Sequence, residues 1–134
     1  MAEALLVGEQ LTEAMVNSGA ALVATLDRQS LLVKAAYWLY LTEQRVWRLV
    51  VVSPEVGVHG PRAVYGRIRA ALTKLPSTVS SVESKDIVVV DTKDRFYLLL
   101  RTAVTTGPDI SGMRFTRNTV NGHFIEDAYL YRVT

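Results

Sequence analysis

Residues 114–132, RFTRNTVNGHFIEDAYLYR, contain the local signal that decides the fold class. Asn121 and Gly122 lie in the middle of this stretch, and the pair tolerates the positive φ angles that a two-residue type I′ turn requires. The flanking segments, residues 114–120 and 123–132, are rich in the β-branched and aromatic residues that are typical of strands. The stretch therefore predicts an antiparallel β-hairpin, and we place the rest of the chain around an antiparallel sheet.

The chain upstream of this hairpin contains two more pairs of strand-like segments. Residues 32–41 and 46–53 form the first pair, and residues 86–91 and 96–103 form the second. A short polar segment separates the two members of each pair, which is typical of a hairpin loop. The three hairpins together predict a mixed, mainly antiparallel sheet of about six strands.

Two segments have the apolar spacing of an amphipathic helix. In residues 3–28, apolar side chains recur at intervals of three, four or seven residues, which places them on one helix face. Gly19 would normally interrupt such a helix, so either one helix with a weak point or two short helices is expected, and we favour one. The second helix covers residues 61–74, begins at Pro61 and is ended by Pro76.

The order of these elements, α-β-β-α-β-β-β-β, defines an α+β fold with two helices. No repeat or linker divides the chain, so we expect a single domain over residues 1–134. An apolar content of 49% excludes a disordered chain, and the lack of cysteine excludes disulfides and thiolate zinc sites. Because the sequence shows neither a signal-peptide pattern nor a membrane-spanning apolar run, we expect a cytoplasmic protein without a membrane partner.

Three of the predicted strands are apolar at consecutive positions rather than at alternate ones. These runs are residues 49–52, 87–90 and 96–100. A continuous apolar run indicates a strand that is buried on both faces, but two helices can cover only one face of the sheet. We therefore expect a homodimer that packs through the open sheet face or through an edge strand.

The segment that leads into the second predicted helix is a candidate anion site. Free backbone N–H groups and the positive end of the helix dipole favour anions at such a position. His59, Gly60 and Arg62 lie at this entry, and Arg69 follows two turns further along. The proline at position 61 removes one donor, and an ordinary strand-to-helix turn with exposed arginines is the alternative interpretation.

A metal-dependent nuclease or phosphoesterase is a second functional hypothesis. Such enzymes place carboxylates around Mg²⁺ and use a lysine to orient water. Asp91 and Lys93 follow an apolar strand in the order acid-x-Lys, and Glu55 follows an earlier strand. The same three-letter pattern occurs at residues 83–85 inside a loop, and Asp, Thr and Lys are ordinary turn residues, so the pattern has little specificity.

A single-stranded nucleic-acid binder is the third hypothesis. Aromatic rings on a sheet face can stack bases when arginines lie beside them. Arg45, Arg48 and Arg114 are the candidate contact residues. The alternative is that the aromatic residues are core residues or cross-strand pairs. The aromatic residues on the predicted strands are Trp38, Tyr40, Trp47, Tyr97, Phe115, Tyr129 and Tyr131.

No motif in the chain supports nucleophilic catalysis, a resident metal or a cofactor. His59 and His123 lie far apart in sequence, and no serine occupies a Gly-x-Ser-x-Gly elbow. The sequence therefore favours a small non-catalytic binding or interaction module, homodimeric and cytoplasmic, with an anionic partner or ligand. The nuclease or phosphoesterase and the nucleic-acid binder remain the alternatives.

Overall fold

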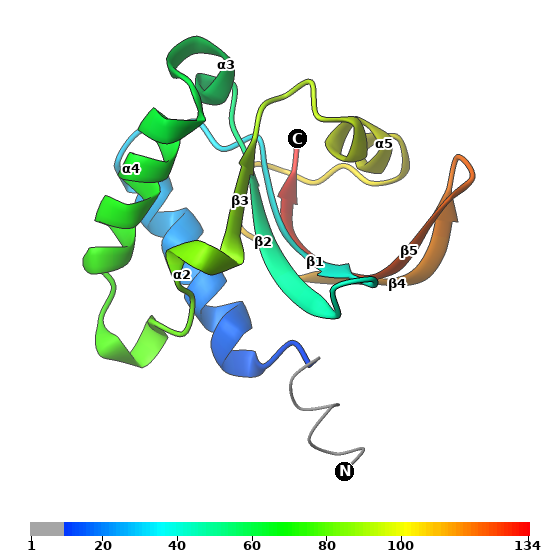
Figure 1. Cartoon of the computed structure of the whole chain (residues 1–134), viewed down its shortest axis with the longest axis horizontal. Coiled ribbons are helices and arrows are strands. Elements are labelled where there is room, and N and C mark those ends of the chain that lie inside the picture. Colours follow the sequence, from blue (N-terminus) through cyan, green and yellow to red (C-terminus); the bar gives the residue numbers. More distant parts are fainter. Residues whose placement is uncertain (1–9) are drawn as a thin grey trace.

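The computed structural model describes residues 10–134, and five strands in this part of the chain form one sheet (Figure 1). Their order across the sheet is β3-β2-β1-β5-β4. β2 and β3 are parallel, and the other neighbouring pairs are antiparallel. The α+β class with a mixed sheet is therefore confirmed, with five strands instead of about six. The strands are β1 (Ala35–Leu41), β2 (Val46–Val52), β3 (Ile87–Val90), β4 (Met113–Val120) and β5 (His123–Val133).

The first and last predicted hairpins are present, but the middle one is not. β1 pairs with β2 and β4 pairs with β5, with Asn121 and Gly122 both at positive φ in the second turn. The predicted strand over residues 96–103 is wrong, because this segment belongs to helix α5 (Arg95–Ala103). β3 therefore has no hairpin partner after it, and within residues 10–134 its one strand partner is β2, in parallel.

Helix α5 begins where the sequence suggested a hairpin turn. The Asp94 side chain accepts a hydrogen bond from the Tyr97 backbone N–H at 3.0 Å, which is the N-cap contact that starts a helix. Tyr97 and Leu100 then lie one helical turn apart and are both fully buried. A continuous apolar run is compatible with a buried strand or a buried helix, and here the cap decides the outcome.

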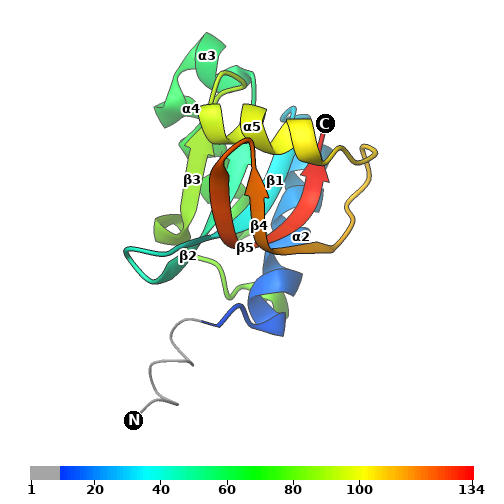
Figure 2. The same cartoon turned by 90° about the vertical axis from the view of Figure 1, so that its right-hand side faces the viewer.

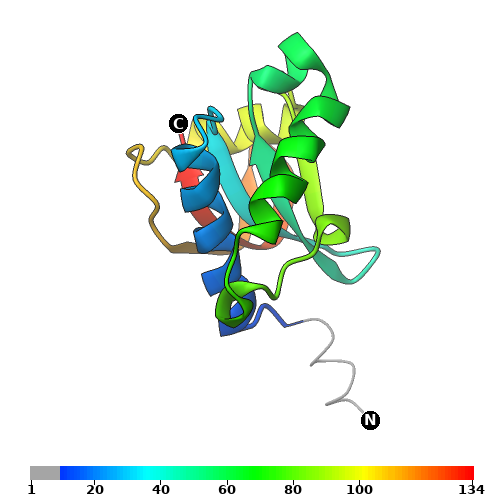
Figure 3. The same ribbon diagram turned by 90° about the vertical axis from the view of Figure 1, so that its left-hand side faces the viewer.

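Helices α2 and α4 lie together on the opposite face of the sheet (Figure 3). α2 (Glu13–Arg28) is capped by Thr12 and runs through Gly19 without interruption, so the single helix is confirmed over the described residues. The predicted residues 3–9 of this helix lie outside the described part, and residues 10–12 are not helical. α4 (Pro61–Thr73) matches its prediction, and a short helix α3 (Glu55–His59) precedes it. None of the helices in residues 10–134 is long and apolar enough to cross a membrane.

At Gly19, two side chains of the sheet pack directly against the backbone of α2. A Cβ atom there would collide with the Tyr131 hydroxyl and would lie 2.9 Å from Trp38 Nε1. The Trp38 indole N–H donates to the Tyr131 hydroxyl at 2.9 Å, and that hydroxyl donates to the Val16 carbonyl of α2 at 2.6 Å. The glycine is therefore required for close approach of the helix and does not weaken it.

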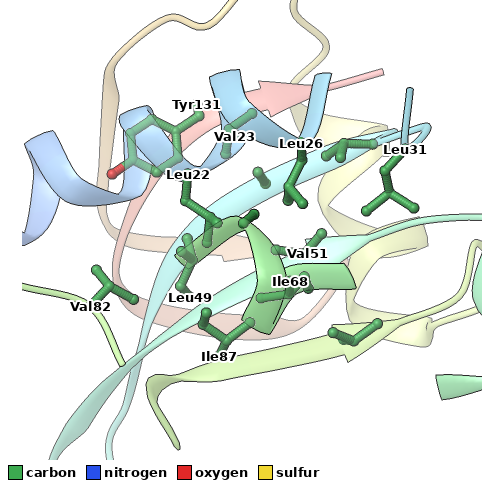
Figure 4. Packing of buried hydrophobic residues seen from close by; sticks show 14 of the residues in the cluster. Leu22, Val23, Leu26, Leu31, Leu49, Val51, Ile68, Val82, Ile87 and Tyr131 are labelled. Atoms are coloured by element: carbon green, nitrogen blue, oxygen red, sulfur yellow. The ribbon is translucent and has the colours of Figure 1, made fainter. Parts of the chain in front are cut away.

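The sheet has a hydrophobic core on each face. The face that carries Trp38, Leu49 and Val51 packs against α2 and α4 (Figure 4). The other face carries Tyr37, Val50 and Leu130 and packs against α5, below which β4 and β5 curl (Figures 1 and 2). The expectation that one sheet face is left uncovered is therefore wrong, because α5 covers the face that the two predicted helices could not cover. We call this second face the concave face.

The two edges of the sheet are protected in different ways. At the β3 edge, the Tyr65 hydroxyl of α4 accepts from the Val89 N–H at 3.1 Å and donates to the Ile87 carbonyl at 3.3 Å. These are the contacts that a further strand would otherwise make. The β4 edge carries the charged side chains of Arg114 and Arg117, and Arg117 has a φ of 49° that interrupts regular strand geometry. Both features oppose edge-to-edge pairing with another chain.

Candidate functional site

Three adjoining hollows on the concave side meet at the side chain of Phe96. The first, of about 620 Å³, lies along α5 and is also lined by Arg95, Leu98, Leu99 and His123. The second, of about 290 Å³, lies between the β1–β2 turn and the start of β5. The third, of about 210 Å³, lies deeper against β1, β2 and β3. We call the third hollow the inner pocket and all three together the concave recess.

The inner pocket is almost entirely apolar. Leucine and valine side chains from the three strands form its floor, and Phe96 of α5 forms one wall. Arg48 and Asp94 are its two charged lining residues, and the structure shows no ion pair between them. The apolar lining consists of Leu39, Leu41, Val50, Val88, Val90 and the Phe96 ring.

Tyr37 lines the inner pocket and provides its buried polar group. Its ring is fully buried and lies 5.8 Å from the Phe96 ring, measured between centroids. Its hydroxyl is buried and has no hydrogen-bond partner in the structure. Burial, followed by the charge of Asp94 and the nearby Tyr97, raises the pKa of Tyr37 well above its usual value. The hydroxyl therefore keeps its proton and is available as a donor.

Irregularities in β4 and β5 shape the recess. Phe115 and Ala128 face each other across the hairpin and point to the concave core. Strict alternation would turn Val120 and Ile125 away from that core, yet both are buried in it. The positive φ of Arg117 lies between the two sets and marks the change of face. The hairpin tip is thereby turned over the concave side, and Phe124 lines the recess while remaining 62% exposed.

The predicted anion residues line none of the three hollows described above and lie at the α3–α4 junction and along α4. His59 ends α3, and Gly60, with a φ of 86°, separates α3 from α4. Arg62 and Arg69 are exposed on α4, and the structure shows no ion pair for either. The first turn of α4 has neither an acidic residue nor a capping side chain. Whether an anion binds there stays a prediction.

The residues of the nuclease hypothesis have structural partners instead. Glu55 forms an ion pair with Arg67 at 3.0 Å and accepts the Leu32 backbone N–H at 3.0 Å. Asp91 accepts the Lys93 backbone N–H at 2.8 Å, which is a turn contact. Within residues 10–134 no three His, Asp or Glu side chains converge as a metal site would require.

The three arginines of the nucleic-acid hypothesis do not form one surface. Arg48 lines the inner pocket on the concave side. Arg114 forms a double hydrogen bond with Asp127, both contacts 2.6 Å long, and covers the Trp47 ring near the other face. The Asp127 hydrogen bond raises the pKa of Arg114 above its usual value. Arg45 occupies the β1–β2 turn with a φ of 59°.

The aromatic residues of that hypothesis are mostly inside the molecule. Trp38, Trp47 and Tyr131 are buried below α2, and Tyr97 is buried on α5 instead of lying on a strand. Base stacking requires an open aromatic face, and these rings do not provide one.

The concave recess was not identified from the sequence. Its lining comes from β1, β2, β3, α5 and β5, and the assignment of Phe96 to a strand hid the wall that α5 builds. The capping residue Asp94 before an apolar run was the available signal. The fold is of the α+β class with a mixed sheet. The chain matches no protein-family model, no curated protein and no solved structure.

Proposed function

We propose that the protein is a non-catalytic binding module that takes a small, largely apolar ligand in the concave recess. The observation that carries this proposal is that Phe96 lines three adjoining hollows whose rim includes exposed apolar side chains. Leu98 is 43% exposed and Phe124 is 62% exposed. Apolar hollows with a few polar groups are the usual form of small-molecule sites, and clustered exposed apolar side chains mark binding surfaces.

A neutral apolar dye such as Nile red tests this proposal by fluorescence titration. We expect saturable binding to the folded chain, weakened about fivefold in Phe124→Ala, because that exposed ring contributes apolar contact to the ligand. Val58→Ala is the matched control: Val58 is 75% exposed, lies on α3 outside the recess, and its loss is expected to leave the titration unchanged.

Equal weakening by the Phe124 and Val58 substitutions, or no saturable binding, would refute the site. A thermal melt of each variant establishes that the dye reports on folded protein. Since Phe124 is largely exposed, its substitution is expected to leave the melting temperature nearly unchanged.

The anionic partner expected from the sequence is a separate part of the proposal and belongs to the α3–α4 surface. Its support is that His59, Arg62 and Arg69 are all exposed, with His59 and Arg62 beside the start of α4 and Arg69 two turns further along the helix. A titration with inorganic phosphate, followed by chemical shifts of the α4 amides, tests it. We expect shifts near Arg62 that disappear in the Arg62→Ala/Arg69→Ala variant and persist in Lys74→Ala at the other end of the helix.

The homodimer also remains a proposal. It no longer follows from an uncovered sheet face, because α5 covers that face. Sedimentation equilibrium at tens of micromolar is expected to give the mass of two chains, and the mass of one chain would end the proposal. We also propose that the protein is cytoplasmic. Fractionation of cells that express it tests this localisation.

A further inference from the structure

The inner pocket has a polar feature that an apolar site alone does not explain. The Tyr37 hydroxyl is fully buried and lacks a hydrogen-bond partner, although such a group costs free energy when it is removed from water without compensation. Other buried hydroxyls of this fold are satisfied: Tyr131 and Tyr97 each bond a main-chain carbonyl, at 2.6 and 2.8 Å. Two other buried side-chain donors without a partner in residues 10–134, Gln29 Nε2 and Arg132 Nε, lie outside the inner pocket, so Tyr37 is the unsatisfied donor that the pocket itself contains.

The surroundings of the hydroxyl determine which partner it can take. Phe96 packs against the Tyr37 ring, and the remaining neighbours in the pocket are mainly aliphatic, so the body of a ligand must be apolar. The carboxylate of Asp94 acts on the Tyr37 hydroxyl, and its negative charge disfavours an anion at that point. A neutral acceptor such as a carbonyl oxygen is not repelled by Asp94, and it brings no charge into the apolar pocket.

We propose that the inner pocket binds a small uncharged molecule with an aromatic or branched aliphatic body, whose carbonyl oxygen accepts a hydrogen bond from the Tyr37 hydroxyl. This inference rests on the proposed function of the concave recess and names the ligand class for it. Because the Tyr37 hydroxyl is buried in the structure, this binding requires the half-buried Phe96 ring, which packs on Tyr37 and borders all three hollows, to move aside for the acceptor. A pocket of about 210 Å³ accommodates one substituted ring, since engineered cavities of about 150 Å³ bind benzene.

Three compounds with the same arrangement of non-hydrogen atoms show whether the pocket prefers a neutral acceptor, no acceptor or an anion. Acetophenone presents a neutral carbonyl, isopropylbenzene presents no acceptor, and benzoate presents an anion. Their dissociation constants are measured by chemical-shift titration against the unaltered chain and against Tyr37→Phe, which removes only the hydroxyl.

We expect the ratio of the acetophenone and isopropylbenzene dissociation constants to change by about 3- to 10-fold in Tyr37→Phe, at the expense of acetophenone. Benzoate is expected to bind more weakly than acetophenone. The ligand class is overturned if the ratio is the same in both chains, or if benzoate binds more tightly than acetophenone. Failure of all three compounds to bind would instead remove the proposed function itself.

The stability of the free Tyr37→Phe variant gives an independent readout. Because the hydroxyl has no partner in the free protein, its removal is expected to leave the urea midpoint unchanged or to raise it. A lowered midpoint would mean that the hydroxyl is already satisfied in the free protein, and the proposal would fail. Tyr131→Phe is the matched control, expected to lower the midpoint because its hydroxyl makes two hydrogen bonds.

Discussion

Gly19 lies in the middle of α2 and has no side chain because two buried aromatic residues occupy the space beside it. The Trp38 indole and the Tyr131 hydroxyl meet at this point, and both side chains are almost completely buried. A shift in strand register helps to place Tyr131 there. Between Ala36 and Tyr37 the pairing of β1 with β5 skips one residue of β5, so Tyr131 has no partner on β1. One glycine and one bulged tyrosine thus set the distance between α2 and the sheet.

At this scale we predict that Gly19→Ala lowers the free energy of unfolding by about 2 kcal/mol. The added Cβ forces apart residues that cannot yield, and this cost exceeds the roughly 1 kcal/mol that alanine gains over glycine in a helix. Urea denaturation monitored by circular dichroism measures the difference.

Gly66→Ala is the matched control, because Gly66 also lies within a helix but has nothing within 4 Å of the Cβ position. We expect this variant to be about 0.5–1 kcal/mol more stable than the unaltered chain. If both substitutions stabilise the protein equally, the packing argument for Gly19 is wrong.

Among the elements, β3 is short, lies at an edge and is kept in the sheet by a helix as well as by a strand. One tyrosine of α4 bonds two of its outward main-chain groups, and its inner side pairs with β2. The helix therefore does more than cover the apolar face of the sheet, because it also closes the edge.

We predict that Tyr65→Phe accelerates hydrogen exchange of the Val89 amide and lowers the free energy of unfolding by about 1 kcal/mol. The substitution removes the acceptor of that amide while preserving the ring and its apolar contacts. Tyr40→Phe serves as control, since its ring contacts Trp47 and its hydroxyl makes no hydrogen bond to another residue of the described range 10–134. Unchanged exchange at Val89 would contradict the edge-closing role.

Most elements could be predicted from local signals, and the failures have a common cause. The Asn121-Gly122 turn, the proline at the start of α4 and the periodic apolar face of α2 each specify their element within a few residues. Residues 96–100 specify only burial, so the choice between strand and helix depended on the Asp94 cap and on the sheet face that needed a cover. Tertiary context supplied that information.

At the scale of the whole molecule, two cores share the same central strands. Alternate residues of β1 face opposite sides: Trp38 belongs to the core below α2, and Tyr37 belongs to the core below α5. Neither core can lose its packing without disturbing strands that the other requires. The protein is therefore expected to unfold in one cooperative step.

This expectation is tested with Leu100→Ala, which removes a fully buried side chain from the concave core. Both tryptophans lie in the other core, so their fluorescence reports on the far side of the sheet. We predict that the tryptophan-monitored urea midpoint falls together with the midpoint from circular dichroism. The free energy of unfolding is expected to fall by about 2–5 kcal/mol. An unchanged tryptophan midpoint would show that the two cores unfold separately.

The candidate site also belongs to this scale, which explains why it was missing from the sequence-based predictions. Tyr37, Asp94 and Phe96 share a pocket only because α5 lies over β1, and no spacing along the chain expresses that contact. Asp94 gives a local signal for the start of α5, but a strand tyrosine and an apolar phenylalanine are ordinary at positions 37 and 96 and give no signal for a pocket. A predicted helix at residues 95–103 would have been the first step toward finding the site.

The central position of β1 has a consequence for how the protein is made. β2 follows β1 directly and can pair as soon as it leaves the ribosome, but the other side of β1 pairs with β5, near the end of the sequence. Until that strand has been synthesised, β1 presents an unpaired edge with apolar side chains on both faces. Premature termination of translation before β5 would leave that edge permanently open, and such products are expected to depend on chaperones or to be degraded.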